Sequence, residues 1–177
     1  ALFGLDSRDT KGKMCFKGNT DSIMILSINT KTKKIKIISI MRDSLVPIDK
    51  DTGLTYYKIN AAYSWGGPEL AIKTLNQNFG LDIANYATVN FYGMSDIIDG
   101  VGGIEATLTP NEVNATGDNN HGINDMIQEI CTYEKKNPRD YYITTSGKQH
   151  LNGLQAVAYA RIRYCTSAWG TTNDYGR

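Results

Sequence analysis

The feature that most constrains the fold is a pair of apolar runs of strand length, Ser22–Asn29 and Lys34–Met41, separated by the polar residues Thr30–Lys33. Both runs are rich in isoleucine, and β-branched residues favour strands. A short polar linker between two such runs predicts a hairpin. Because apolar residues follow one another directly in both runs, we expect both strands to be buried on two faces, at interior places in a sheet.

The segments that follow alternate between helical and extended patterns. Apolar residues at helical spacing predict one helix over Pro68–Asn78, ended by Gly80, and another over Tyr92–Val101. Short strands are predicted at residues 1–6, 86–91 and 104–108. Strands that alternate with helices indicate a layered α/β fold.

Other segments carry loop signals or weaker helix signals. Residues 47–53 hold one proline, two aspartates and a glycine, a composition typical of a loop. The periodic pattern is lost between Pro110 and Arg139, apart from a short helix predicted over residues 123–134. Start signals in residues 146–152 predict a last helix over Gly153–Ala160.

Length and charge limit the classes of protein. With 177 residues and 41% apolar residues, the chain is long enough for one well-filled core, so we expect one domain over residues 1–177. The net charge of +1 gives no bulk attraction to nucleic acid. No apolar stretch approaches the ~20 residues that span a bilayer. Because the chain opens directly with a strand, we expect a domain whose upstream segment was removed.

The three cysteines, Cys15, Cys131 and Cys165, match no zinc-binding spacing, and an odd number leaves at least one unpaired. If the domain works outside the cytoplasm, a disulfide between Cys131 and Cys165 is plausible. Ordinary free thiols are the alternative, and the sequence does not decide between the two.

Arg161 and Arg163 follow the last predicted helix and are separated by one apolar residue. If that helix ends near Ala160, the two arginines enter extended chain and project to the same side. Two guanidinium groups there suit the oxygens of a phosphate or pyrophosphate. The alternative is a solvated helix end, where an arginine offsets the negative end of the helix dipole.

Acidic and basic residues also gather where predicted strands begin and end. Asp6 follows the first strand and Asp21 opens the second, so their carboxylates are candidates for a hard cation such as Mg²⁺, unless they only cap turns. Arg42 and Asp43 directly follow a buried strand, where open α/β sheets place ligand groups. An intramolecular ion pair is the alternative. Lys58 precedes a glycine-containing helix start, where anions are favoured.

Six motifs, in order along nearly the whole chain, resemble the LytR-CpsA-Psr family: GLDSRD, NTDSIMILSIN, ISIMRDS, KINAAY, VNFYGMSDIIDGVGGI and GKQHLNGLQAVAYARIRY followed by DYGR. The resemblance implies a three-layer α/β/α sandwich with a mixed central sheet and an apolar cavity for a lipid tail. It also implies a phosphotransferase that moves a glycopolymer, such as teichoic acid or capsular polysaccharide, from a polyprenyl pyrophosphate carrier to peptidoglycan. Such enzymes lie on the extracytoplasmic face of the cell membrane, held by an N-terminal anchor that this sequence does not include.

The resemblance also assigns residues by position. Asp6 and Asp21 match the family's metal-binding aspartates, which implies Mg²⁺ or Mn²⁺. The matches to its pyrophosphate-binding and surrounding polar residues are Arg8, Arg42, Lys58, Arg161, Arg163, Asp174 and Arg177. The general base is open between Asp43 and Asp9, and we expect His121 and His150 to be loop or helix-cap residues.

The sequence departs from the family pattern at three positions. Asn19 replaces the usual arginine two positions before the second aspartate, so Lys17 or Arg8 has to supply that phosphate contact, if anything does. Met41 replaces a proline, and Ala61 replaces a histidine. Two other functions therefore stay open: a non-catalytic binding module for lipid pyrophosphate or cell wall, and a metal-dependent pyrophosphate hydrolase.

Overall fold

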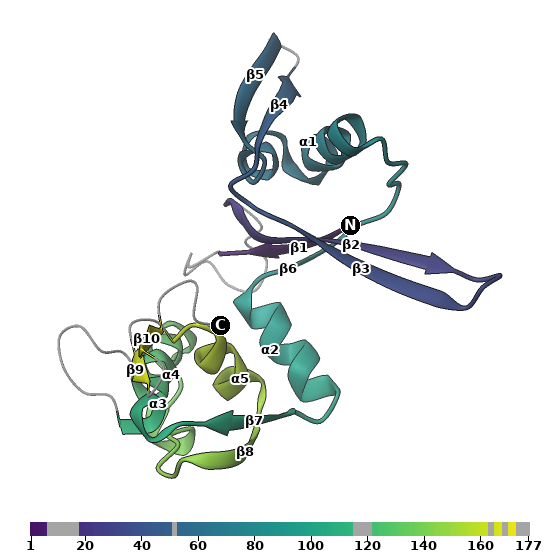
Figure 1. The fold of residues 1–177 in the computed structure, drawn as a ribbon. Coiled ribbons are helices and arrows are strands. Elements are labelled where there is room, and N and C mark those ends of the chain that lie inside the picture. Colours follow the sequence, from purple (N-terminus) through teal and green to yellow (C-terminus); the bar gives the residue numbers. More distant parts are fainter. Residues whose placement is uncertain (7–17, 51–52, 115–121, 163–164, 168–169, 173–177) are drawn as a thin grey trace. The chain divides into compact units, whose positions relative to one another are not determined.

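The structure is a computed structural model that describes residues 1–6, 18–50, 53–114, 122–162, 165–167 and 170–172, with backbone alone at residue 50 and beyond residue 162. The chain divides into two compact units, Ala1–Phe91 and Tyr92–Arg177. Figure 1 shows the elements of each unit. Within the described ranges, no helix has the length and apolar character needed to cross a membrane. That the whole chain forms one domain stays a prediction.

The first unit is built on a four-stranded sheet with the order β3-β2-β1-β6. Its strands are β1 (Leu2–Leu5), β2 (Thr20–Asn29), β3 (Lys34–Ile40) and β6 (Ala87–Val89). β1 and β6 pair in parallel, whereas β1–β2 and β2–β3 are antiparallel. This mixed sheet with helices confirms the predicted α/β class, and the pairing of Asn29 with Lys34 confirms the predicted hairpin.

The prediction that both hairpin strands are interior and buried on two faces is wrong for β3 and, as to burial, for the second half of β2, where Ile28 is 61% exposed. Within the described residues β3 is an edge strand, and the side chains of Ile35 and Ile37 are 67% and 63% exposed. β1 pairs only with the first half of β2, from Thr20 to Met24. The hairpin therefore extends beyond the shorter strands, as Figure 1 shows, and its second half lacks a neighbour on one side.

A second hairpin, β4 (Leu45–Lys50) and β5 (Gly53–Lys58), occupies the segment for which a loop was predicted. That prediction was wrong because the turn-forming residues hid an alternating pattern. Val46 and Ile48 are buried, while their neighbours along β4 are less so. The buried pair belongs to the core of the first unit, whereas Pro47 between them and Asp49 after them are part-exposed.

Helix α1 (Ala61–Phe79) starts earlier than predicted and is kinked at Gly66 and Gly67. Pro68, the predicted start, begins the second segment, where its fixed φ suits the first turn of a helix. Gly80 ends the helix as predicted, in the left-handed conformation with φ 62°. The sequence suggested that Gly66 and Gly67 stand at the start of the helix. The structure instead places both inside it. The core between α1 and the strands contains Phe3, Leu5, Ile23, Val46, Ile48, Ile59, Ala62, Tyr63, Ala71 and Leu75.

The second unit combines helices with two antiparallel strand pairs. The chain enters it through α2 (Phe91–Gly100), as predicted, and continues through β7 (Ile104–Leu108) and α3 (Pro110–Asn114). The later elements are α4 (Ile123–Glu134), the 3₁₀ turn η1 (Pro138–Asp140), β8 (Gly147–Leu151), α5 (Gly153–Ala160), β9 (Cys165–Ser167) and β10 (Gly170–Thr172). α4 and α5 have the predicted bounds. Residues 146–150, predicted as part of a helix start, instead belong largely to β8, which pairs with β7.

Three hydrogen bonds fix the start of α5. Asn152 caps the helix: its side chain accepts from the Gln155 N–H, and the Gln155 side chain accepts from the Asn152 N–H. The Gly153 N–H donates to Asp99 Oδ1 at 2.6 Å. A Cβ at Gly153 would lie only 2.0 Å from the Ser95 carbonyl oxygen, so glycine is what permits this close approach to α2.

Candidate functional site

The two predicted metal-binding aspartates lie at adjoining ends of paired strands. Leu5 pairs with Thr20 and Gly4 pairs with Ser22, so Asp21 is the extra residue of a β-bulge. Bulges redirect side chains and are frequent next to active sites. Asp6 directly follows the paired residue Leu5. The pairing of β1 with β2 therefore brings both aspartates to one edge of the sheet.

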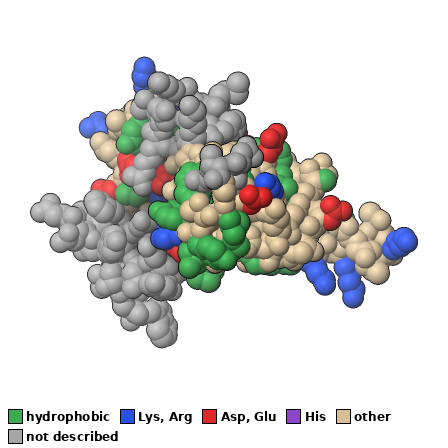
Figure 2. Space-filling view, turned by 90° about the horizontal axis from the view of Figure 1, so that it is seen from above, with side chains coloured by type: hydrophobic (Ala, Val, Ile, Leu, Met, Phe, Trp, Pro, Cys, Tyr) green, Lys and Arg blue, Asp and Glu red, His purple; other side chains and the backbone are tan. Residues whose placement is uncertain are grey.

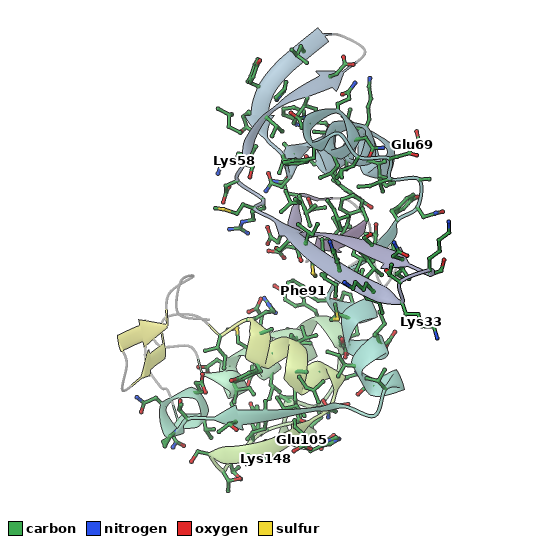
Figure 3. All side chains as sticks on the ribbon, turned by 45° about the vertical axis from the view of Figure 1, so that its right-hand side comes forward. Lys33, Lys58, Glu69, Phe91, Glu105 and Lys148 are labelled. Carbon is green, nitrogen blue, oxygen red and sulfur yellow. The ribbon has the colours of Figure 1, made fainter. Side chains whose placement is uncertain are left out.

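Arg42 joins this edge through an ion pair. Its Nη1 lies 2.6 Å from Asp21 Oδ1, and its Nε lies 3.5 Å from Asp43 Oδ2. Lys58 Nζ in turn lies 2.6 Å from Asp43 Oδ1, at the end of β5 (Figure 3). Asp21, Arg42, Asp43 and Lys58 thus form one chain of alternating charges, which we call the charged cluster. The structure brings together four of the predicted site residues here.

The backbone holds the turn that carries Arg42 and Asp43. The Asn60 N–H donates to the Arg42 carbonyl oxygen at 3.2 Å, and the Ile59 N–H donates to the Ser44 carbonyl oxygen at 2.9 Å. Ile59 and Asn60 are buried. The turn is therefore fixed to the core of the first unit, whereas the charged side chains remain part-exposed.

The charges of the cluster shift the protonation of its members. The hydrogen bond from Lys58, with the nearby Arg42, holds the pKa of the Asp43 carboxyl below its usual value. The charge and hydrogen bond of Asp21 raise the pKa of Arg42. Asp43 is consequently ionised at neutral pH, as a general base must be, but a lowered pKa means a weaker affinity for the proton.

Asp6 and Asp21 suit a cation that is held by only two protein carboxylates and completes its coordination with waters and substrate oxygens. No group of three or more His, Cys, Asp or Glu side chains in the described ranges is placed to hold a metal. Mg²⁺, however, is usually held by one or two carboxylates with waters and substrate phosphates. The buried hydroxyl of Thr20, next to Asp21, has no hydrogen-bond partner in the structure, so this edge also has an oxygen whose bonding is unsatisfied.

Arg161 belongs to the second unit, where it is the C-cap residue of α5. Its Nη2 lies 2.8 Å from Glu129 Oε1 on α4, and its side chain is only 13% exposed. The helix ends at Ala160 as predicted, but Arg161 has φ −94° and ψ −4°, which is not extended backbone. The prediction of extended chain from Arg161 onward is therefore wrong for that residue. No pattern in the sequence indicates Glu129 as its partner.

Several predicted residues lie outside the part of the chain described here. These are Arg8, Asp9, Cys15, Lys17, His121, Arg163, Asp174 and Arg177. Asn19 is described and is exposed, at the residue before Thr20. The roles assigned to all of these residues stay predictions.

Two further predictions concern single residues. His150 is neither a loop nor a cap residue: it lies in β8, with Nδ1 2.8 Å from Glu105 Oε1. Lys148 of the same strand contacts the same carboxylate, and Figure 3 labels Glu105 and Lys148. His150, Lys148 and Glu105 thus form a group of exposed charged and polar side chains on the second unit. Cys131 is a buried free cysteine, and burial raises the pKa of its thiol.

Comparisons with known proteins give the relatives of this chain. The family model described as "LytR_cpsA_psr family" matches residues 1–177. The polyisoprenyl-teichoic acid–peptidoglycan teichoic acid transferase TagV of Bacillus subtilis is 35% identical over 162 residues, which is 92% of this chain and 36% of TagV. The Biofilm regulatory protein A of Streptococcus mutans is 32% identical over 99% of this chain and 39% of that protein.

Solved structures agree with these relatives. The structure of TagT from Bacillus subtilis with bound octaprenyl pyrophosphate lipid matches with a TM-score of 0.59 and 25% identity, over 92% of this chain and 55% of that one. The chain spans less than two-fifths of the length of these two curated relatives. Because the family model matches every residue of the sequence, the chain belongs to the LytR_cpsA_psr family.

Proposed function

We propose that this chain is the catalytic part of a phosphotransferase that moves a glycopolymer from a polyprenyl pyrophosphate carrier to peptidoglycan. The observation that carries the proposal is the charged cluster, in which Arg42 lies between Asp21 and Asp43 and next to the edge that holds Asp6. TagV, a relative, is by name a teichoic acid transferase acting on peptidoglycan, and TagT has been solved with a polyprenyl pyrophosphate lipid.

In the proposed reaction, a hydroxyl of the acceptor attacks the phosphorus that carries the glycan. The new phosphorus–oxygen bond replaces the bond to the bridging oxygen of the pyrophosphate. Polyprenyl phosphate leaves with the electrons of that bond, and the hydroxyl proton passes to a base. Positioning and charge stabilisation dominate phosphoryl transfer, so no covalent nucleophile is required.

Arg42 supplies the positive charge in the first unit. Its side chain presents several N–H donors, of which one lies within 2.6 Å of Asp21. A guanidinium fork binds phosphate oxygens in pairs, and developing charge on the leaving phosphate strengthens those bonds. Arg161 and Arg163 supply the second and third arginines.

Asp43 orients the two cations beside it. Its carboxylate contacts both Arg42 and Lys58, and its lowered pKa keeps it charged at neutral pH. That low proton affinity favours positioning over proton transfer, which leaves Asp9 as the other candidate for the base.

Asp6 and Asp21 are the residues that would hold Mg²⁺ or Mn²⁺. When bound, such an ion supplies positive charge to the oxygens of a pyrophosphate. Asp21 then serves two groups at once, because its Oδ1 already accepts from Arg42. We expect the full protein to be anchored in the cell membrane with this domain on the extracytoplasmic face, where the lipid-linked glycan and peptidoglycan are found.

One experiment tests the proposal. The protein is incubated with a synthetic polyprenyl-pyrophosphate glycan and Mg²⁺, with and without peptidoglycan oligomers, and the products are separated by mass. A glycan–peptidoglycan conjugate that forms only with the acceptor supports the transferase. Polyprenyl phosphate released at the same rate without acceptor identifies a hydrolase, and no turnover with tight binding identifies a binding module.

A further inference from the structure

An exposed pair of aromatic side chains, Tyr57 of β5 and Trp65 of α1, forms a surface outside the charged cluster. The ring centroids lie 5.1 Å apart, and the ring planes are tilted by 40°. The two residues are 50% and 39% exposed. In the space-filling view from above, hydrophobic side chains reach the surface as a group on the side of the β4–β5 hairpin (Figure 2).

Regular structure holds each ring in place. Tyr57 pairs across the hairpin with Val46, which is buried against the core of the first unit. Trp65 is the last residue before the kink of α1, where Gly67 has φ 66° and ψ −162°. A Cβ at Gly66 would lie 2.6 Å from that of Leu70, so the kink brings the two helical segments close together. The pair is therefore positioned by a strand and a sharply turned helix.

The backbone connects this pair to the charged cluster. Ile59 and Asn60 lie between Tyr57 and Trp65 in the sequence, and their N–H groups donate to the carbonyl oxygens of Ser44 and Arg42. The segment that links the two aromatic residues is thus hydrogen-bonded to the turn that carries the phosphate-binding arginine. Tyr57 and Trp65 are therefore three and five residues away from Asn60, whose N–H is bonded to the carbonyl oxygen of Arg42.

The chemistry of the pair selects an amphipathic ligand. An aromatic face is apolar and carries negative quadrupole potential, while the tyrosine hydroxyl and the indole N–H add polar edges. A sugar ring matches this surface, because its C–H groups form an apolar face and its hydroxyl groups surround the edge. A lipid chain is better served by an enclosed apolar cavity than by half-exposed rings beside ion pairs.

We propose that Tyr57 and Trp65 form a stacking surface for a sugar ring of the lipid-linked glycan. The inference rests on the proposed function, in which the first sugar of the donor is bonded directly to the pyrophosphate. A sugar-binding surface for that donor has to lie near the phosphate-binding residues, and the segment from Tyr57 to Trp65 is hydrogen-bonded to the turn that carries Arg42. The surface would make the protein prefer glycosylated polyprenyl pyrophosphate over the bare lipid.

The test compares two ligands in detergent: a polyprenyl pyrophosphate that carries one or two sugars, and the same lipid without sugar. Loss of one stacking contact, worth about 1 kcal/mol, corresponds to a Kd increase of about fivefold. We expect Trp65→Ala to raise the Kd for the sugar-bearing lipid by about fivefold to tenfold and to leave the Kd for the bare lipid unchanged. Trp65→Phe is expected to retain most of the affinity.

Another aromatic residue of α1 provides a matched control. Phe79 is 44% exposed and is the last residue of the helix, several turns away from Trp65. Phe79→Ala should therefore leave both Kd values unchanged. Thermal unfolding of each variant checks that Trp65→Ala still folds.

Tryptophan fluorescence gives a second measurement, in which the side chain of Trp65 is kept. The sequence has two tryptophans, so Trp169→Phe leaves Trp65 as the only indole. Its emission is expected to shift with the sugar-bearing lipid and not with the bare lipid. Equal losses for the two lipids on Trp65→Ala, or no loss for either, would overturn the stacking surface. If the unmodified protein binds neither lipid, the proposed function itself fails, and the stacking surface fails with it.

Discussion

Arg42 Nη1 lies 2.6 Å from Asp21 Oδ1, and this contact joins the turn after β3 to the bulge of β2. A charge that is already paired still binds anions when the ligand offers more oxygens than one carboxylate. Both side chains are more than one-third exposed, so a ligand can reach them. The pair therefore holds Arg42 in position for a phosphate without closing it off.

The first prediction concerns the arginine of the charged cluster. Arg42→Ala removes a charge-assisted contact to phosphate worth about 1.5–3 kcal/mol, so the Kd for polyprenyl pyrophosphate should rise by roughly tenfold to a hundredfold. Arg42→Lys should recover only part of the affinity, because an ammonium group cannot bind in the paired geometry. Titration calorimetry measures both.

A similar ion pair on the same unit is the control for that experiment. Lys73 Nζ lies 2.9 Å from Asp49 Oδ2, at an exposure close to that of the Arg42 pair. Lys73→Ala should leave the lipid affinity unchanged. A loss as large as that of Arg42→Ala would mean that the total charge of the unit, and not the cluster, governs binding.

The second prediction is a pH effect at Asp43. Lys58 and Arg42 lower the pKa of this carboxyl from the ordinary aspartate value of 3.8, so the folded state binds fewer protons than the unfolded state near that pH. The contribution of Asp43 to stability is therefore present above 3.8 and is lost as the pH falls through the lower folded pKa. Carbon-detected NMR titration of Asp43 should show its pKa rising toward 3.8 in Lys58→Ala. An unchanged Asp43 titration in that variant would show that Lys58 does not act on it.

The third prediction concerns the contact between α5 and α2. A Cβ at Gly153 would overlap the backbone of Ser95, so Gly153→Ala should lower the free energy of unfolding by about 1–3 kcal/mol or more. Gly100 has nothing within 4 Å of an added Cβ, and Gly100→Ala should be neutral or slightly stabilising. Denaturant unfolding of both variants measures the difference. Equal stabilities would contradict the close approach of the two helices.

The fourth prediction concerns the thiol of Cys131. Because the side chain is buried and its pKa is raised, alkylation of the native protein at pH 8 should leave Cys131 unmodified until the protein unfolds. Mass spectrometry of peptides after iodoacetamide treatment locates the label. Rapid labelling of Cys131 in the folded protein would contradict its burial.

The sequence predicted elements best where one local signal was unopposed. The capping pattern at Asn152 and the glycine at position 80 placed the ends of α5 and α1 correctly. The prediction failed at residues 47–53. Their proline, aspartates and glycine indicated a loop, although Val46 and Ile48 are buried and alternate with less buried residues, as in a strand. The burial of β3 was also mispredicted. Whether a strand lies at the edge of a sheet depends on which other strands pair and how long they are, and the sequence of β3 does not show this.

The candidate site was predicted in part. The positions of Asp21, Arg42 and Asp43 at strand ends were readable from the sequence, and the structure joins them with Lys58. The pairing of Arg161 with Glu129 was not readable, since it depends on how α4 packs against α5. The bulge that exposes Asp21 was also missed, because its register depends on β1.

The most direct test of the central claim is a double-mutant cycle on Arg42 and Lys58, the two cations of the charged cluster. The Kd for a polyprenyl-pyrophosphate glycan is measured for the unmodified protein, Arg42→Ala, Lys58→Ala and the double variant, with Lys73→Ala as the control. If the charged cluster binds the pyrophosphate, each single variant weakens binding, and the combined effect differs from the sum by about 0.5 kcal/mol or more. Full binding by both single variants would contradict the claim.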